Sequence, residues 1–151
     1  MTFIFFMLNS LHIRMSFGIS TKADYGVVLM TALAENAKGS PLSLRAISKH
    51  KRLPYSFLAQ IVRHLKQARL VVSKEGLGGG YALARKSNTI TLKEIVEILD
   101  GPIAIAPCTR DGRACPTQHI CGTKSEWEKL KTNISDLLGD TTLADIIKSS
   151  S

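Results

Sequence analysis

All three cysteines of this 151-residue chain lie close together, at Cys108, Cys115 and Cys121. Thiolates are soft ligands, and three of them on one segment suit an iron–sulfur cluster or a zinc ion. Structural zinc sites usually use C-x2-C pairs, because a short turn presents two sulfur atoms to one ion. The gaps here are C-x6-C and C-x5-C, which favours a loop around a larger cluster. Unligated thiols on a loop are the plainer alternative.

A fourth ligand must come from another residue type. The candidates are His119 and Asp111 within the cysteine segment, and Asp24 nearer the N-terminus. A lone histidine on a loop is more often solvated than ligating. The odd number of cysteines argues against a closed set of intrachain disulfides. Clustered thiols in a chain without an evident secretion signal suit a reducing cytoplasm.

Positive charge is concentrated in the middle of the chain. The net charge is +8. Between Lys38 and Lys86, eleven lysines and arginines stand against one acid, whereas the remaining residues include nine basic and eleven acidic ones. A concentrated basic segment predicts a polyanionic partner, with nucleic acid as the first candidate.

The spacing of apolar residues predicts the elements that would position these groups. Helices are expected over about 21–37, 42–49, 55–68 and 91–99, with Ser20 or Thr21 and then Ser43 as the first two caps. The pair 42–49 and 55–68 has helix-turn-helix spacing, in which the second helix enters the major groove of DNA. Two β-rich runs, 70–73 and 81–84, flank a glycine cluster and predict a hairpin, or wing.

The last long helix starts near Ser125 and is expected to end at Gly139, with Thr141 capping a final turn. Its apolar stripe consists of Trp127, Leu130, Ile134, Leu137 and Leu138. Such a stripe packs on its own domain or pairs with a second copy. We favour pairing, because DNA-reading helices usually act in two-fold dimers.

The predicted fold is therefore mainly α with a small β-hairpin. It comprises a winged helix-turn-helix domain over residues 16–101, a cysteine loop over 102–122, and a dimerisation helix with a C-terminal tail over 123–151. Residues 1–15 are expected to form an extension outside the fold. Their apolar run is far shorter than the roughly 20 residues of a membrane span, and it lacks the features of a signal peptide.

This order of features resembles the Rrf-two family of winged-helix regulators, which includes the IscR-type and NsrR-type iron–sulfur sensors. The resemblance covers about residues 19–147. The matching segments are STKADYGVVLMTALA, LPYSFLAQIVRHLKQARLV, GLGGGYALAR, ITLKEIVEILDGPI and the cysteine loop. The segments DGPIAIAPC and TLADII look most like the branch that regulates the SUF iron–sulfur assembly operon.

The resemblance implies that the three cysteines bind the cluster, which we expect to be of the 2Fe–2S type, with 4Fe–4S as the alternative. Asp24 matches the position from which NsrR-type members supply an acidic ligand across the dimer. We therefore expect Asp24 as the fourth ligand and take His119 as the second candidate. Lys124 stands where IscR-type members place a histidine, so that ligand is absent here.

The family reads DNA with the first part of its recognition helix, and the hairpin adds a wing. The expected DNA contacts are Tyr55, Ser56, Ala59, Gln60, Arg63, Lys74, Gly78, Gly79 and Gly80. Gln60 can form two hydrogen bonds to adenine, and the glycines let backbone N–H groups approach phosphates. Ala59 replaces a glutamate that IscR-type members use to discriminate between sites. The expected dimerisation residues are Trp127, Leu130, Ile134 and Leu137.

These features predict a cytoplasmic, homodimeric DNA-binding transcriptional regulator, a repressor whose affinity for its operator depends on an iron–sulfur cluster. Its targets would be genes for cluster assembly. We expect no membrane partner, no small-molecule substrate and no enzymatic activity, because the chain lacks a convincing nucleophile–base set. The alternatives are a cluster-free thiol- or zinc-dependent regulator, a nitric-oxide sensor of the same fold, and a small electron-transfer protein. The last would leave the basic segment unexplained.

Overall fold

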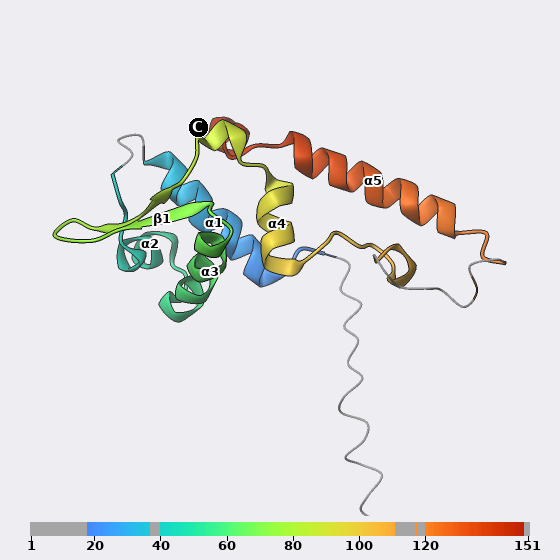
Figure 1. Ribbon diagram of the computed structural model, residues 1–151, viewed down its shortest axis with the longest axis horizontal. Coiled ribbons are helices and arrows are strands. Elements are labelled where there is room, and N and C mark those ends of the chain that lie inside the picture. Colours follow the sequence, from blue (N-terminus) through green and yellow to red (C-terminus); the bar gives the residue numbers. More distant parts are fainter. Residues whose placement is uncertain (1–17, 37–39, 111–116, 118–119, 150–151) are drawn as a thin grey trace, which may run out of the picture.

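A computed structural model describes residues 18–36, 40–110, 117 and 120–149 (Figure 1). The predicted extension over residues 1–15 lies outside the described residues. The elements are α1 (Thr21–Glu35), α2 (Leu44–Lys51), α3 (Tyr55–Gln67), β1 (Val71–Lys74), β2 (Gly80–Leu83), η1 (Ser87–Thr89), α4 (Leu92–Asp100), η2 (Pro107–Thr109), α5 (Lys124–Asp140) and α6 (Leu143–Ser149). This order confirms a mainly helical fold with one antiparallel hairpin and a long helix towards the C-terminus. None of the described helices combines the length and hydropathy needed to cross a membrane.

Local hydrogen bonds set the starts of the helices. Ser20 caps α1 by accepting from the Ala23 N–H at 3.2 Å, and Ser43 caps α2 by accepting from the Ala46 N–H at 3.1 Å. The prediction for α2 was displaced by two residues at each end. The reason is tertiary: the backbone of Leu42 is bonded to Tyr81 of the hairpin at 2.9 and 2.8 Å, so Leu42 is extended rather than helical.

The core lies around α1, which packs against α3, α4, α6 and β2. Its fully buried larger side chains are Leu29, Met30, Leu58, Ile61, Leu65, Leu70, Val71, Ile90, Ile95 and Leu143. Gly26 allows α1 and α4 to approach closely, because a Cβ atom at this position would lie 2.1 Å from Leu99 Cδ1. The helix-turn-helix pair α2–α3 therefore packs on α1, which also contacts α4 and α6.

The chain returns to the winged-helix body after α5. Leu143 is fully buried and donates its N–H to the Ile90 carbonyl at 3.0 Å, while the Leu92 N–H bonds to the Thr141 carbonyl at 2.9 Å. The predicted stop at Gly139 is wrong, since α5 continues to Asp140. Because its carbonyl accepts the Leu92 N–H, Thr141 lies in the connection between α5 and α6 and is not the predicted cap of the last turn. Thr142 caps α6 instead, its hydroxyl accepting from the Asp145 N–H.

Candidate functional site

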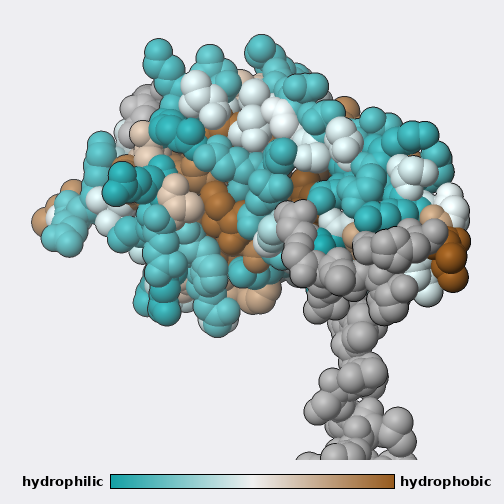
Figure 2. Space-filling view, turned by 45° about the vertical axis from the view of Figure 1, so that its right-hand side comes forward, coloured by the Kyte–Doolittle hydropathy of each residue, from teal (hydrophilic) through white to brown (hydrophobic). Residues whose placement is uncertain are grey.

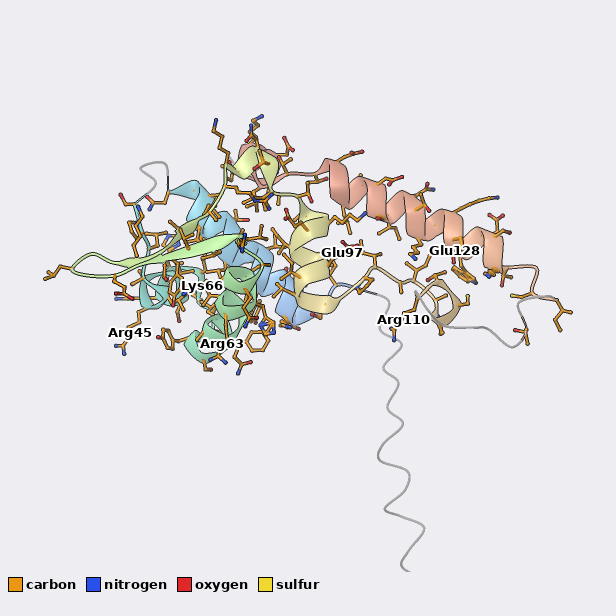
Figure 3. The ribbon with its side chains drawn as sticks, viewed as in Figure 1. Arg45, Arg63, Lys66, Glu97, Arg110 and Glu128 are labelled. Atoms are coloured by element: carbon orange, nitrogen blue, oxygen red, sulfur yellow. The ribbon has the colours of Figure 1, made fainter. Side chains whose placement is uncertain are left out.

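The exposed face of α3 carries most of the residues expected to read DNA. The helix buries Leu58, Ile61, Val62 and Leu65, and this apolar face determines which side chains point outward. Tyr55, Ser56, Gln60 and Arg63 are exposed, whereas Ala59 is half-buried. In Figure 3 the side chains of Arg45 and Arg63 project from the lower end of the body, from α2 and α3 respectively.

Two contacts hold this face in place. The Arg45 guanidinium lies 5.9 Å from the centroid of the Tyr55 ring, which is within the range of a cation–π interaction. Lys66 Nζ donates to Ser73 Oγ at 2.9 Å and so links α3 to the wing. Arg45 was not among the predicted contacts, because nothing in the local sequence pairs it with Tyr55.

The positive charges of this face are not neutralised within the described part of the chain. The three ion pairs found there are Lys51–Glu35, Arg85–Glu94 and Lys129–Glu126. None of them involves α3 or the tip of the wing, so the charges of Arg45, Arg63 and Lys74 are available to phosphate groups.

The wing projects beyond the helices at the left of Figure 1. Gly76 and Gly78 have φ values of 101° and 81°, which favour glycine. A Cβ on Gly79 would lie 2.4 Å from the Lys74 carbonyl oxygen. Leu77 is completely exposed between these glycines. The sequence had predicted that this tip presents backbone N–H groups to phosphates. In Figure 2 the protrusion at the left is mainly hydrophilic, whereas apolar residues gather in a patch at the centre of the view and at its right edge.

The structure describes two of the three cysteines of the cysteine loop. Cys108 is in η2, Cys121 is three residues before α5, and both are free, half-buried thiols. Cys115, Asp111 and His119 lie outside the described residues. Cys121 Sγ lies 3.3 Å from the Thr123 hydroxyl. This hydrogen bond, with further help from nearby N–H groups and Lys124, lowers the pKa of the Cys121 thiol.

A lowered pKa favours the thiolate, which is the form that binds metal. Two accessible thiols, one of them with a lowered pKa, fit a thiolate-bound cluster or metal ion. Asp24 is exposed on α1. Among the residues the structure describes, no three Cys, His, Asp or Glu side chains gather as a metal site. A single chain therefore does not bring Asp24 together with Cys108 and Cys121, and its role across a dimer stays a prediction.

The predicted apolar stripe of α5 is divided between two surroundings. Trp127, Leu130 and Leu137 are exposed. Ile134 and Leu138 instead line a cavity of about 410 Å³ formed with the end of α4 and the segment after it. Figure 1 shows α5 extending away from the winged-helix body. The helix thus uses one part of its stripe within its own chain, while the other part stays exposed among the residues that the structure describes.

The sequence matches the Rrf2 (Rrf-two) family, described as an iron-dependent transcriptional regulator, over residues 19–149. The chain belongs to this family. CymR of Bacillus subtilis is 32% identical over 128 residues, covering 85% of this chain and 88% of CymR. IscR of Vibrio atlanticus is 32% identical over 131 residues, covering 86% of this chain and 75% of IscR.

Solved Rrf2 structures have the same fold. The structure of CymR, the global cysteine regulator of B. subtilis, has a TM-score of 0.78 at 29% identity, and the match covers 90% of this chain and 100% of that one. IscR of T. potens has a TM-score of 0.74 at 34% identity and covers 91% and 90%. These relatives confirm the winged-helix fold and the expectation of a DNA-binding transcriptional regulator rather than an enzyme.

Proposed function

We propose that this Rrf2 protein is a cytoplasmic, homodimeric repressor whose affinity for its operator is controlled by an iron–sulfur cluster on Cys108, Cys115 and Cys121. Its targets are genes for iron–sulfur cluster assembly, and the cluster is of the 2Fe–2S type, with 4Fe–4S as the alternative. The observation that carries the proposal is the pair of accessible thiols, Cys108 and Cys121, in the loop joining the DNA-reading body to α5. A cluster held by these cysteines would supply a labile cross-link within that loop.

The start of the cysteine loop is tied to α1. The Asp100 carboxylate accepts the Ser20 N–H at 3.0 Å and the Ser20 hydroxyl at 2.5 Å, and Lys22 Nζ donates to the Leu99 carbonyl at 2.8 Å. Because α1 packs on α3, a shift at the end of α4 reaches the recognition helix through rigid elements. A difference of about 1.4 kcal/mol between two poses changes the affinity for DNA tenfold.

The two-fold relation between recognition helices would come from α5. Exposed Trp127, Leu130 and Leu137 offer an apolar face for a second copy. Two recognition helices about 34 Å apart match one turn of the DNA duplex and bind a near-palindromic operator. Asp24 is the proposed fourth ligand, supplied by the second copy.

A second candidate is a cluster-free, thiol- or zinc-dependent regulator. It is favoured by the structural similarity to CymR, which is described as a global cysteine regulator. The same donors, Cys108 and Cys121, would then respond to oxidation or bind zinc. A nitric-oxide sensor of the same fold would use the cluster itself as the target.

Anaerobic purification distinguishes these functions. We expect iron and acid-labile sulfide in similar amounts, and tighter binding of the cluster-loaded protein to an operator selected from random DNA. The cluster-free protein, measured at the same salt concentration, serves as the comparison. Stoichiometric zinc without sulfide, or equal affinity of both forms, would rule out the cluster-controlled repressor.

The Asp24→Ala variant tests the fourth ligand. We expect a changed visible spectrum and at least about tenfold faster cluster loss, because even residues that only support metal ligands contribute that much. Absorption during chelator treatment measures both. Asp140→Ala is the control, since Asp140 is also an exposed helical aspartate. A spectrum and a loss rate equal to those of the unmodified protein would exclude Asp24 as a ligand.

The Gln60→Ala variant tests the recognition helix. Its operator affinity is expected to fall about tenfold or more, since a two-bond contact to a base contributes roughly 1–3 kcal/mol. Affinity for unrelated DNA should not change, because phosphates supply non-specific binding. Gln67→Ala is the matched control, an exposed glutamine at the end of the same helix. Equal losses on operator and unrelated DNA would contradict base recognition by Gln60.

A further inference from the structure

The turn that carries Cys108 is held together by one buried threonine. Only 1% of the surface of Thr109 is exposed. Its hydroxyl accepts the N–H groups of Ile105 and Ala106, both at 3.2 Å, and donates to the Ala106 carbonyl at 2.9 Å. These bonds give η2 a defined shape, and Cys108 therefore sits on an ordered turn rather than on a loose strand.

A lysine of α5 fastens this turn to the helix. Lys131 Nζ donates to the Thr109 carbonyl at 2.8 Å, across 22 residues of sequence. Lys131 is half-buried, and η2 packs against α5. Figure 3 shows η2 beside the first half of α5, near the labelled Arg110 and Glu128. A hydrogen bond from a charged donor is roughly twice as strong as a neutral one.

The same helix also fixes the other described thiol. Cys121 lies just before α5, and Thr123 is both its hydrogen-bond partner and the residue at the start of the helix. The positions of both described thiols therefore depend on α5. Cys121 is next to the helix in the sequence, and the turn of Cys108 is bonded to Lys131 of the helix. Loss of the Lys131 bond would remove a tie between the Cys108 turn and α5 and leave the bond of Cys121 to Thr123 intact.

We infer that Lys131 is a positioning residue for the cluster. It holds the Cys108 turn against α5, the helix at whose start Cys121 is bonded to Thr123, before the cluster binds. The inference rests on the proposed function and adds a residue outside the ligand set. The Lys131 bond also gives a path by which binding of a cluster to the cysteine loop would affect α5, the helix proposed to pair with a second copy.

Lys129 provides a matched control two residues away on the same helix. It is exposed and pairs with Glu126 within α5 at 2.8 Å. Lys131→Met removes the charged donor and keeps a long side chain, whereas Lys131→Arg keeps a donor that can reach a carbonyl. Lys129→Met removes the same charge without touching η2.

Hydrogen–deuterium exchange on the cluster-free protein gives a readout that needs no cluster. We expect faster exchange of the 103–110 segment in Lys131→Met, little change in Lys129→Met, and recovery in Lys131→Arg. In the cluster-loaded protein, chelator-driven cluster loss should be about three- to tenfold faster in Lys131→Met, given the strength of a charged hydrogen bond.

Unchanged exchange in Lys131→Met would overturn the inference, as would faster exchange accompanied by an unchanged rate of cluster loss. An equal acceleration in Lys129→Met would also overturn it, because net charge would then be the cause. Failure of the proposed function is separate, since it would appear in the unmodified protein as a lack of iron and sulfide.

Discussion

Replacing Cys108 with serine is expected to leave the protein without a cluster while its winged-helix body stays folded. A serine hydroxyl is a far poorer ligand for iron than a thiolate, because it is harder and stays protonated near neutral pH. Cys108 is half-buried in η2 and lies outside the hydrophobic core. Iron and sulfide should therefore fall to background, while thermal unfolding of the body remains close to that of the unmodified protein.

The same variant should bind its operator about tenfold more weakly or worse, which corresponds to roughly 1.4 kcal/mol of lost preference for the binding pose. Cys121→Ser should behave alike, whereas Ser125→Ala, on the exposed surface of α5, should retain the cluster. Iron and sulfide assays with operator titrations at one salt concentration measure these effects. A Cys108→Ser protein with full iron content and unchanged operator affinity would remove the cluster site from the mechanism.

Replacing Leu143 with alanine is expected to lower the free energy of unfolding by about 2–5 kcal/mol, the range for a buried leucine whose loss leaves a cavity. Leu143 is fully buried in the core that also contains Ile90, Leu29 and Ile95. The residue lies after α5, in a segment predicted as a tail. A large loss would show that this tail is part of the DNA-binding body.

Leu77→Ala is the control for this measurement. Leu77 is completely exposed at the tip of the wing, and surface substitutions of this kind usually change stability by less than about 0.5 kcal/mol. Urea denaturation at equal protein concentration compares the two variants, because the stability of the proposed dimer would depend on concentration. If Leu143→Ala unfolded at the same urea concentration as Leu77→Ala, α6 would have no part in the folded core.

The order of the helices, their ends to within about two residues, and the exposed face of α3 could be predicted from the sequence. These features depend on residues three or four apart: Ser20 and Ala23 form a cap within one turn, and the buried positions of α3 repeat at helical spacing. The spacing of the three cysteines and the concentration of positive charge between Lys38 and Lys86 can likewise be read directly from the sequence. The same local patterns underlie the resemblance to the Rrf2 family, which the comparisons confirmed.

Other features were decided only by the tertiary structure, because they depend on groups far apart along the chain. The bond from Lys131 to the Thr109 carbonyl spans 22 residues, and the bonds from Ser20 to Asp100 span 80. Leu143 enters the core only because the chain turns back after α5, and no local periodicity encodes that return. The cysteine loop and the segment after α5 are therefore placed by hydrogen bonds and packing between residues that are distant in the sequence.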